Sequence, residues 1–322
     1  MKAIVFDTYG PPEVLHTVEV PVPGVGPNQI RVRVAAATVN PHDLMVRAGD
    51  YDAYFSPDTP VPRRPGMDAA GVVDAVGSRA DTRVQVGDSV VAIVDPFSAS
   101  GGAYAEYVTV DADQVVAAPI GASAVEAATL PLNGLTATGA LDSLNLAAGA
   151  TLWVTGAAGG VGGFAVQLAR TRGLHVIADA AAAEIGTLRR LGVHTIVDRD
   201  TTDPARPVLA ARPRGVDAIL DAALLQQQAL PALVGTGTIA VLRNPGQRDT
   251  AELDLADTRI RVTHPVITDH IHHTGQLQHL SDLAGDHLLA LRVSGTYPAD
   301  QAADAHRRLG QGGLLGRLVL TF

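Results

Sequence analysis

The sequence contains no cysteine. Disulfide bonds, a catalytic thiol and zinc sites with cysteine ligands are therefore excluded. The absence of cysteine also agrees with a cytoplasmic protein, and we expect that location. Lysine is nearly absent as well, since Lys2 is the only one and arginine supplies the other positively charged side chains.

Positive charge and long apolar runs are both scarce. The formal net charge is −9 with no cluster of lysine and arginine, whereas a nucleic-acid-binding protein generally needs a basic face. No apolar run approaches the ~18 residues of a membrane-spanning helix. The first residues also lack the basic region and apolar core of a signal peptide. We expect a small-molecule partner, with no nucleic acid and no membrane.

The chain is long enough for two domains. It has 322 residues, of which 47% are hydrophobic. That length is large for one domain, and that hydrophobic content provides a sizeable core and argues against disorder.

The most informative stretch covers residues 151–179. Residues 151–155 form an apolar, β-branched run typical of a buried strand, and a glycine-rich turn follows at 156–163. Residues 164–172 carry apolar side chains at helical spacing, and a second buried strand ends at Asp179. Strand, glycine turn, helix, strand and acid make up the first βαβ unit of a dinucleotide-binding domain.

Phosphate binding explains why glycine is favoured at this turn. A pyrophosphate binds N–H groups at the positive end of a helix, and a Cβ would hold it away. We expect Gly159 to let the phosphates approach the backbone and Gly162 to let the helix pack close to the strand. Ala157 stands where the fingerprint usually has its first glycine.

The whole chain divides into three segments. Residues 1–120 contain short apolar or alternating runs, interrupted by glycine and proline, which predict an irregular β-barrel. Residues 121–260 alternate strand and helix patterns, which predicts a parallel sheet with helices on both faces. Residues 261–322 are expected to return to the first domain. Further helices are expected at 183–191, 226–234 and 299–309, and further strands at 30–35, 71–76, 89–94, 195–197, 216–221, 238–242 and 317–322.

Several motifs occur in a fixed order along the chain. They are VNPHDLMVRAG at 39–49, PGMDAAGVVDAVG at 65–77, GGAYAEYVTV at 101–110, AATLPLNGLTATGAL at 127–141, TGAAGGVGGFAVQLAR at 155–170 and AHRRLGQGGLLGRLVL at 305–320. With these motifs the chain resembles, over essentially its whole length, the zinc-independent medium-chain dehydrogenases/reductases of the quinone oxidoreductase type.

The resemblance implies an α/β fold with a GroES-like β-barrel catalytic domain, a Rossmann domain and a cleft between them. It implies transfer of a hydride from NAD(P)H to a quinone or to an activated C=C bond of an enone or enoyl substrate. Relatives are commonly dimers, so it also implies a homodimer.

Zinc alcohol dehydrogenases of the same superfamily differ at the metal site. Their Gly-His-Glu is replaced here by Gly66, Met67 and Asp68, and their cysteine ligands are missing. Without a Lewis acid, reduction of an enone is easier than reduction of a ketone, because the developing charge spreads into an enolate that needs only hydrogen bonds. We therefore expect no metal.

The resemblance suggests three catalytic residues. Asn40 and Tyr51 would face the nicotinamide or substrate, and Tyr51 would donate a proton or hydrogen bond to the enolate. Thr136 would fix the nicotinamide ring. Structural alternatives are a plain turn for Asn40, a half-buried aromatic for Tyr51 and a helix N-cap for Thr136.

Three nearby positions have other expected roles. Asp43 and Asp68 are candidates for acids that hold loops, and Met45 replaces a tyrosine common in relatives.

The resemblance also assigns cofactor contacts. The phosphate-binding positions, through backbone N–H groups, are Ala158, Gly159, Gly160 and Val161.

Two further cofactor contacts lie later in the chain. Leu242 ends a strand whose following loop, 245–248, borders the nicotinamide in this fold. Arg317 matches a basic position close to the cofactor and alternatively caps the last strand.

The adenosine end contains conflicting signals. Asp179 would bond the ribose hydroxyls and favour NADH, and Ala181 and Glu184 replace the Ser and Lys of NADPH-dependent relatives. Arg199, however, stands where relatives contact the 2′-phosphate, and the family mostly uses NADPH. The choice stays open, with a slight preference for NADPH from family habit.

The sequence Asp269-His270-Ile271-His272-His273 suggests a second metal hypothesis. His270 and His272 would share a face of a strand, and Asp269 could add an oxygen. No further ligand stands at regular spacing, so a polar loop is the preferred interpretation.

Other functions remain open. A pathway-specific biosynthetic enoyl reductase would use the same chemistry. Met45 and the LLQQQ sequence at 224–228 depart from the family, which leaves room for a non-redox protein on the same scaffold. An RNA-binding or crystallin-like role is disfavoured by the acidic charge.

Overall fold

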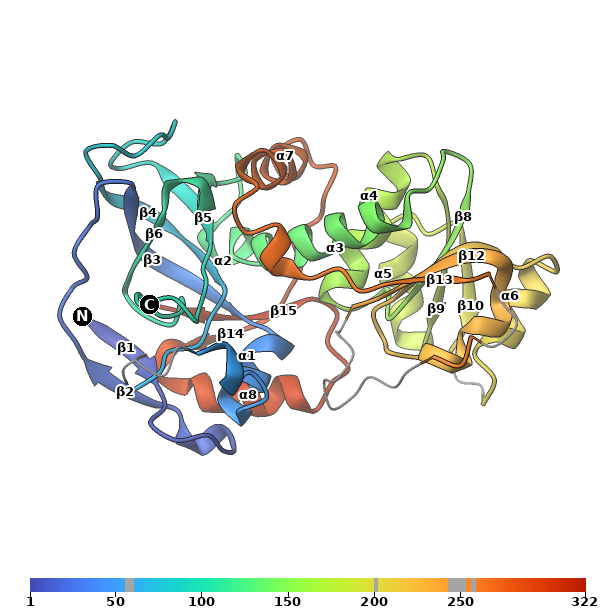
Figure 1. Ribbon diagram of the computed structural model, residues 1–322, viewed down its shortest axis with the longest axis horizontal. Coiled ribbons are helices and arrows are strands. Elements are labelled where there is room, and N and C mark those ends of the chain that lie inside the picture. Colours follow the sequence, from blue (N-terminus) through green and yellow to red (C-terminus); the bar gives the residue numbers. More distant parts are fainter. Residues whose placement is uncertain (56–60, 200–201, 243–252, 256–258) are drawn as a thin grey trace. The chain divides into compact units, whose positions relative to one another are not determined.

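The computed structural model describes residues 1–55, 61–199, 202–242, 253–255 and 259–322. The chain forms two compact units (Figure 1). The first comprises Met1–Leu132 and Ile271–Phe322, and the second comprises Asn133–His270. The boundary near residue 132 falls inside helix α3 (Pro131–Leu144). The segment ends expected at 120 and 260 therefore come earlier in the chain than the ends of the compact units.

The first unit is built around a seven-stranded sheet. Its strand order is β14-β15-β3-β4-β5-β7, and β6 pairs with β3 off this path. The strands of the first unit, including the separate β1-β2 pair, are β1 (Lys2–Val5), β2 (His16–Glu19), β3 (Gln29–Val39), β4 (Asp68–Val76), β5 (Ser89–Ile93), β6 (Tyr107–Asp111), β7 (Val115–Ala117), β14 (Val293–Pro298) and β15 (Arg317–Thr321).

Strand β3 organises this sheet, because it pairs with β4, β6 and β15, all antiparallel. Ile30, Val32 and Val34 on β3 are buried and alternate with arginines, as the sequence pattern predicts. These residues lie in the apolar core of the first unit.

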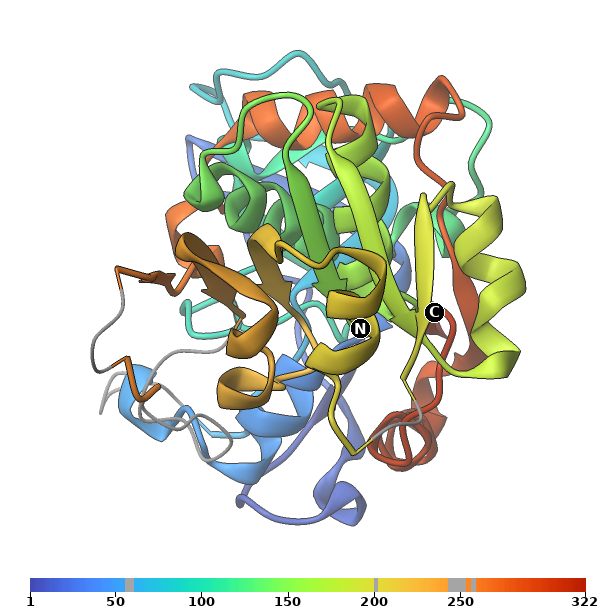
Figure 2. The ribbon, with the colours of Figure 1, turned by 90° about the vertical axis from the view of Figure 1, so that its right-hand side faces the viewer.

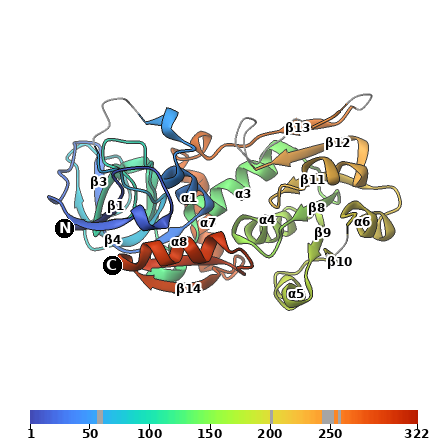
Figure 3. The same ribbon diagram turned by 90° about the horizontal axis from the view of Figure 1, so that it is seen from below.

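The helices of the first unit are α1 (Pro41–Ala48), α2 (Ala124–Ala127), α7 (Thr274–Gly285) and α8 (Ala302–Gly310). Figure 3 shows α8 lying along β14, and α8 also contacts α1 and β15. The C-terminal segment therefore completes both the sheet and the helical cover of the first unit. The helix expected at 299–309 is confirmed as a 3₁₀ turn, Ala299–Gln301, followed by α8.

The second unit contains a six-stranded parallel sheet in the order β10-β9-β8-β11-β12-β13. Its helix α4 lies on one side of the strands and α6 on the other (Figures 1 and 3), and Figure 2 turns this unit toward the viewer. The elements are β8 (Thr151–Thr155), α4 (Gly160–Thr171), β9 (His175–Ala180), α5 (Ile185–Arg190), β10 (Thr195–Asp198), α6 (Ala205–Ala211), β11 (Val216–Asp221), β12 (Leu233–Val241) and β13 (Arg261–Thr263).

Most elements expected in the second unit are confirmed, and one is wrong. The bounds of β8 and β11 are those the sequence predicts. The helix expected at 226–234 does not form. Two 3₁₀ turns, Gln226–Gln228 and Leu230–Ala232, stand there instead, and β12 already begins at Leu233. Left-handed backbone at Leu224 and Gln226 directs the chain away from a regular helix.

Gly71 tests how closely β3 and β4 approach. A Cβ at Gly71 would lie 2.0 Å from the Arg33 carbonyl oxygen. We expect Gly71→Ala to destabilise the protein by about 1–3 kcal/mol, because the two strands must separate. Urea unfolding followed by circular dichroism measures this loss. The matched control is Gly235→Ala in β12, where a Cβ meets nothing within 4 Å. Equal stability of the two variants would contradict this account of the sheet.

Candidate functional site

The turn between β8 and α4 has almost no room for side chains. A Cβ at Gly162 would lie 2.4 Å from the Gly156 carbonyl oxygen and 2.8 Å from Ala157 Cα. Gly162 therefore allows the helix to lie against the turn, as predicted. Gly156 has φ +59°, a conformation that favours glycine. The tight turn thus uses Gly156, which explains why Ala157 is tolerated at the next position.

Gly159 differs from Gly162 in a way that matters for binding. It caps α4 with φ −72°, which any residue adopts, and its Cβ would meet only the Gly156 carbonyl oxygen, at 3.2 Å. A side chain at 159 would therefore require the Gly156 carbonyl to shift by a few tenths of an ångström, a smaller change than at Gly162. The first N–H groups of a helix have no partner within that helix and attract anions. Gly159 and the start of α4 therefore fit a phosphate that must approach the backbone closely.

This turn lies at the topological switch point of the sheet. From β8 the chain proceeds outward to β9 and β10, and then returns to β11 on the other side of β8. In open α/β sheets, ligands bind outside the carboxyl ends of the strands at such a point. Here the last residues of the two central strands are joined, since the Thr155 hydroxyl donates to Asp221 Oδ1 at 2.6 Å.

Asp221 also holds the strained loop that follows β11. Its carboxylate accepts the N–H groups of Leu225 at 3.0 Å and Gln226 at 2.7 Å. Leu224 has φ +59° and Gln226 has φ +51°, which costs free energy in residues other than glycine. The sequence drew attention to 224–228 as a departure from the family. It gave no sign that Asp221 and Thr155 hold this segment.

At the end of β9, the Asp179 side chain is oriented differently from what its expected contact with a ribose requires. The Asp179 side chain is only 1% exposed and points toward buried Trp153, whose Nε1 donates to Oδ1 at 3.3 Å. Burial raises the pKa of Asp179, and the nearby Arg199 guanidinium opposes that shift. The contact with a ribose expected of Asp179 stays a prediction.

In the first unit, Asn40 sits in a buried polar cluster. Its Nδ2 donates to Asp68 Oδ2 at 2.6 Å and to Thr38 Oγ1 at 2.9 Å, and Thr38 in turn donates to Asp68. A carboxamide has two N–H donors, so both are used within this unit. The Asn40 side-chain amide is therefore held in one orientation by Thr38 and Asp68.

Asp43 and Asp68 hold backbone, which agrees with their expected structural role. Asp43 accepts the N–H groups of Asn40 at 2.8 Å and Gly66 at 3.0 Å. Asp68 accepts the N–H of Leu132 at 2.6 Å. Both ends of the Asn40 residue, its backbone N–H and its side chain, are thus fixed by carboxylates.

A hydrogen-bonded chain leads from Asp43 to the C-terminal helix. Arg47 has only donors, so its Nη1 donates to His306 Nδ1 at 3.3 Å. His306 Nε2 must then carry the proton and donate to Tyr104 Oη at 3.1 Å, and Tyr104 donates to Asp43 at 3.3 Å. Burial, with the neighbouring Arg47 charge, lowers the pKa of His306 to about 3. The neutral histidine therefore connects an arginine with a carboxylate.

The other charges of this cluster are also shifted by burial. Burial raises the pKa of Asp43 to about 7 and that of Asp68 to about 6, although several hydrogen-bond donors oppose both shifts. Arg317, at the start of β15, is 8% exposed. Burial lowers its pKa to about 10, and the carboxylates of Asp68 and Asp43 act in the opposite direction. Arg317 thus belongs to the buried cluster around Asn40.

Tyr51 lies in a cluster of rings in a chain that is only 4% aromatic. Its ring centroid is 4.6 Å from that of His42, 5.4 Å from that of Tyr54 and 5.9 Å from that of Phe97. Burial lowers the pKa of His42 to about 4, so this ring is neutral. Within the described part of the chain, His42 Nδ1 is buried without a hydrogen-bond partner. Tyr51 and Phe97 are half-buried.

Thr136 and Leu242 both belong to the second unit. Thr136 lies inside α3, which begins at Pro131, so it is not the N-cap of that helix. Leu242 directly follows β12 and is half-buried. The loop expected to border the nicotinamide, 245–248, lies outside the described residues.

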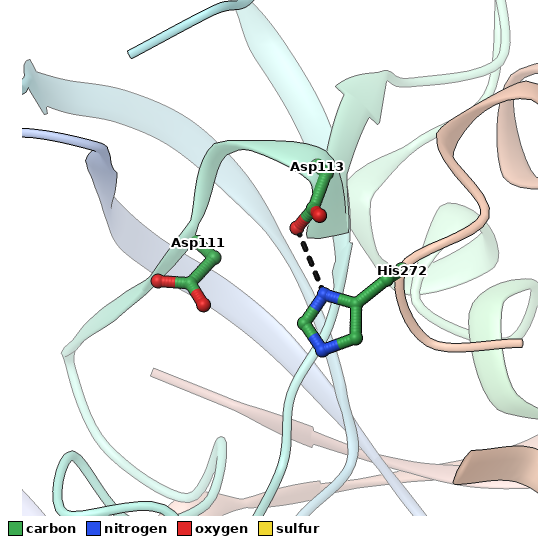
Figure 4. A group of neighbouring side chains, drawn as sticks. All are labelled: Asp111, Asp113 and His272. Carbon is green, nitrogen blue, oxygen red and sulfur yellow. Dashed lines mark hydrogen bonds and ion pairs between the residues drawn. The ribbon is translucent and has the colours of Figure 1, made fainter. Parts of the chain in front are cut away.

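The histidine-rich segment forms a turn rather than a strand. Asp269 ends a 3₁₀ turn, Ile267–Asp269, and the next residues also turn, which confirms the polar-loop interpretation. Among the described residues, one group could bring three metal-ligand atoms within 4.8 Å, namely Asp111, Asp113 and His272 (Figure 4). All three are exposed, and His272 Nδ1 already pairs with Asp113 at 3.0 Å.

Within the ranges that the structure describes, no helix combines the length and the apolar character needed to cross a membrane.

The fold and the glycine turn are those of a two-unit protein with a Rossmann-type parallel sheet, and comparisons with known proteins agree. The family model "Alcohol dehydrogenase GroES-like domain" matches residues 26–120, and "Zinc-binding dehydrogenase" matches residues 191–320. A probable quinone oxidoreductase of Schizosaccharomyces pombe is 31% identical over 97% of this chain and 94% of its own length. The chain therefore belongs to the quinone oxidoreductase family of medium-chain dehydrogenases/reductases.

Other relatives match over different lengths. The quinone-oxidoreductase homolog of spinach chloroplasts is 36% identical over 64% of this chain, and the match spans 63% of the spinach protein. Two solved structures match nearly throughout. A mycobacterial protein in complex with NADPH has a TM-score of 0.86 at 28% identity and covers 100% of both chains. The CurK enoyl reductase has a TM-score of 0.86 at 26% identity, over 99% of this chain and 98% of that one.

The buried carboxyls predict how stability depends on pH. An unfolded aspartate has a pKa of about 4, whereas the folded pKa is about 7 for Asp43 and about 6 for Asp68. The folded state therefore holds more protons between these values. The stability that results is complete below about pH 4 and is lost as pH rises toward 7.

We expect this loss to become smaller in Asp43→Asn, which removes the group with the higher pKa. Melting temperatures of both proteins at half-unit pH steps test this expectation. Asp282→Asn, at an exposed position of α7, is the control and should follow the wild type. Parallel curves for wild type and Asp43→Asn would contradict the assignment.

Proposed function

We propose that this protein is a metal-free oxidoreductase that uses NAD(P)H to reduce a quinone or an activated C=C bond. The glycine turn at the switch point carries this proposal, because Gly159 caps α4 where a phosphate must approach the backbone. The names of the relatives, quinone oxidoreductase and enoyl reductase, support the substrate class.

The residues present fit a dinucleotide. The pyrophosphate would lie beside Ala158 and Gly159 at the positive end of α4, with the N–H groups of Gly160 and Val161 as donors. The Gly159 N–H itself donates to the Gly156 carbonyl oxygen at 2.9 Å. Thr136 and Leu242 would border the nicotinamide. When bound, the reduced nicotinamide supplies a hydride from its C4 atom.

Tyr51 is the proposed proton or hydrogen-bond donor to the substrate oxygen. Its phenol is a hydrogen-bond donor, and its ring packs against the neutral His42 ring and against Phe97. Asn40 is proposed to border the substrate, with its side-chain amide held in place by Thr38 and Asp68.

The proposal needs no metal. Met67 and Asp68 occupy the zinc-binding dipeptide of related alcohol dehydrogenases, and Asp68 is engaged by Thr38, Asn40 and Leu132. Charge that develops on an enolate or hydroquinone can be stabilised by hydrogen bonds alone. A homodimer, which rests on the family resemblance, and a cytoplasmic location, which rests on the absence of cysteine, complete the proposal.

The binding part of the proposal is tested at Gly159. We expect Gly159→Ala to weaken dinucleotide binding about tenfold or more, because the methyl group holds the phosphate away from the helix end. Its melting temperature should fall less than that of Gly162→Ala, because a Cβ would lie 3.2 Å from the Gly156 carbonyl oxygen at 159 and 2.4 Å from it at 162. Nicotinamide fluorescence titration measures the affinity. Gly275→Ala, where a Cβ meets nothing within 4 Å, is the control. Unchanged affinity in Gly159→Ala would remove the proposed phosphate site.

The catalytic part is tested at Tyr51. We expect oxidation of NAD(P)H by 1,4-benzoquinone or by a simple enone, and we expect Tyr51→Phe to lower kcat about 100-fold, since general acid catalysis contributes at least that much. The phenylalanine ring preserves the packing against His42. The matched control is Tyr54→Phe, because Tyr54 is 56% exposed in the same cluster. Full activity of Tyr51→Phe on both acceptors would exclude Tyr51 as the donor.

A further inference from the structure

Arg199 lies in the region where nucleotide-binding folds contact the adenosine ribose of the cofactor. Strands β9 and β10 are parallel neighbours in which Asp179 is opposite Val197. Arg199 follows β10, and its backbone N–H donates to the Ala180 carbonyl oxygen at 3.1 Å. The end of the second strand of the βαβ unit is where such folds recognise the 2′-hydroxyl or bind a 2′-phosphate through a nearby arginine.

The Arg199 guanidinium is already engaged by two carboxylates. Its Nη2 pairs with Glu184 Oε2 at 2.6 Å, and its Nε lies 3.8 Å from Asp179 Oδ2. Two negative side chains thus surround one positive one. A phosphate here would meet a guanidinium whose charge is already compensated.

Glu184 is fixed in this place by the backbone. Its Oε2 also accepts the Ala181 N–H at 3.0 Å, across the turn that leads into α5. Glu184 is 12% exposed, whereas Asp179 is 1% exposed and turned toward Trp153. The carboxylate that an approaching 2′-phosphate meets first is therefore that of Glu184.

The side chains between the two acids cannot bind a phosphate. Residues 180–183 are all alanine, so they provide neither hydroxyl nor cationic side chains. A 2′-phosphate carries about −1.5 to −2 charges at neutral pH. It would have to separate Arg199 from Glu184 and would still lie beside a carboxylate that the Ala181 N–H holds in place.

We propose that Glu184 selects the cofactor. Its carboxylate pairs with Arg199 in the place where a 2′-phosphate would otherwise bind, and the protein therefore uses NADH. This inference rests on the proposed function. It gives Glu184, rather than Asp179, the selecting role. It also sets this chain apart from its mycobacterial structural relative solved with NADPH, and it replaces the slight preference for NADPH drawn from family habit.

The test is a pair of fluorescence titrations with NADH and NADPH, performed on the wild type and on Glu184→Gln. The wild type should bind NADH at least tenfold more tightly than NADPH, since like charges at close range cost several kcal/mol. Glutamine keeps an acceptor for the Ala181 N–H but removes the negative charge that compensates Arg199. Glu184→Gln should therefore tighten NADPH binding about tenfold and change NADH binding less than threefold.

A matched control removes the same charge elsewhere in this unit. Asp142 pairs with Arg172 at 2.7 Å, and Arg172 follows the opposite end of α4 from the glycine turn. Asp142→Asn should leave the ratio of the two affinities unchanged. Arg199→Ala in the Glu184→Gln background should abolish the gain for NADPH, which assigns the effect to this pair.

The outcomes separate this inference from the proposed function. Tighter binding of NADPH by the wild type, or an unchanged affinity ratio in Glu184→Gln, would overturn the role of Glu184 while leaving an NAD(P)H-dependent reductase intact. Failure of both cofactors to bind the wild type would overturn the proposed function and this inference with it.

Discussion

The close approach of backbone to backbone at the glycine turn is the constraint on which the second unit depends. The helix after β8 can begin only because Gly162 allows it to lie against Gly156 and Ala157. This contact brings the N-terminus of α4 to the carboxyl end of β8, beside β11, where Thr155 and Asp221 join the two central strands. Gly159 stands directly before this helix, where the proposed phosphate would approach the backbone.

In the first unit, the main constraint is that polar groups are fixed beside an apolar core. Asn40 is held by Asp43 at its backbone and by Asp68 at its side chain. Behind Asp43, Tyr104, His306 and Arg47 form a chain of donors with one direction. Burial opposes the charged form of each carboxylate, and the surrounding donors offset part of that cost. Such a network fixes one geometry at the proposed substrate side, because each group has its partner only in this arrangement.

The elements that were predicted correctly are those that depend on short stretches of the sequence. Buried strands such as β8 and β11 were found at their true bounds, since β-branched runs closed by polar residues depend on neighbours in sequence. The helix expected at 226–234 was wrong, because the Asp221 carboxylate binds the N–H groups of Leu225 and Gln226 and fixes a left-handed turn. The inward orientation of Asp179 depends on Trp153, and the role of His306 depends on Tyr104 and Arg47. These partners meet only in the folded chain, so spacing and composition could not reveal them.

The central claim is hydride transfer from a nicotinamide to carbon, and isotope labelling tests it most directly. The wild-type protein would be supplied with an enone and with NADH that carries deuterium at C4, in its 4R and 4S forms separately. The account predicts that one of the two forms delivers its deuterium to the β-carbon of the saturated product, where mass spectrometry detects it. Product without deuterium from either form, or oxidation of the cofactor without reduction of the enone, would contradict it.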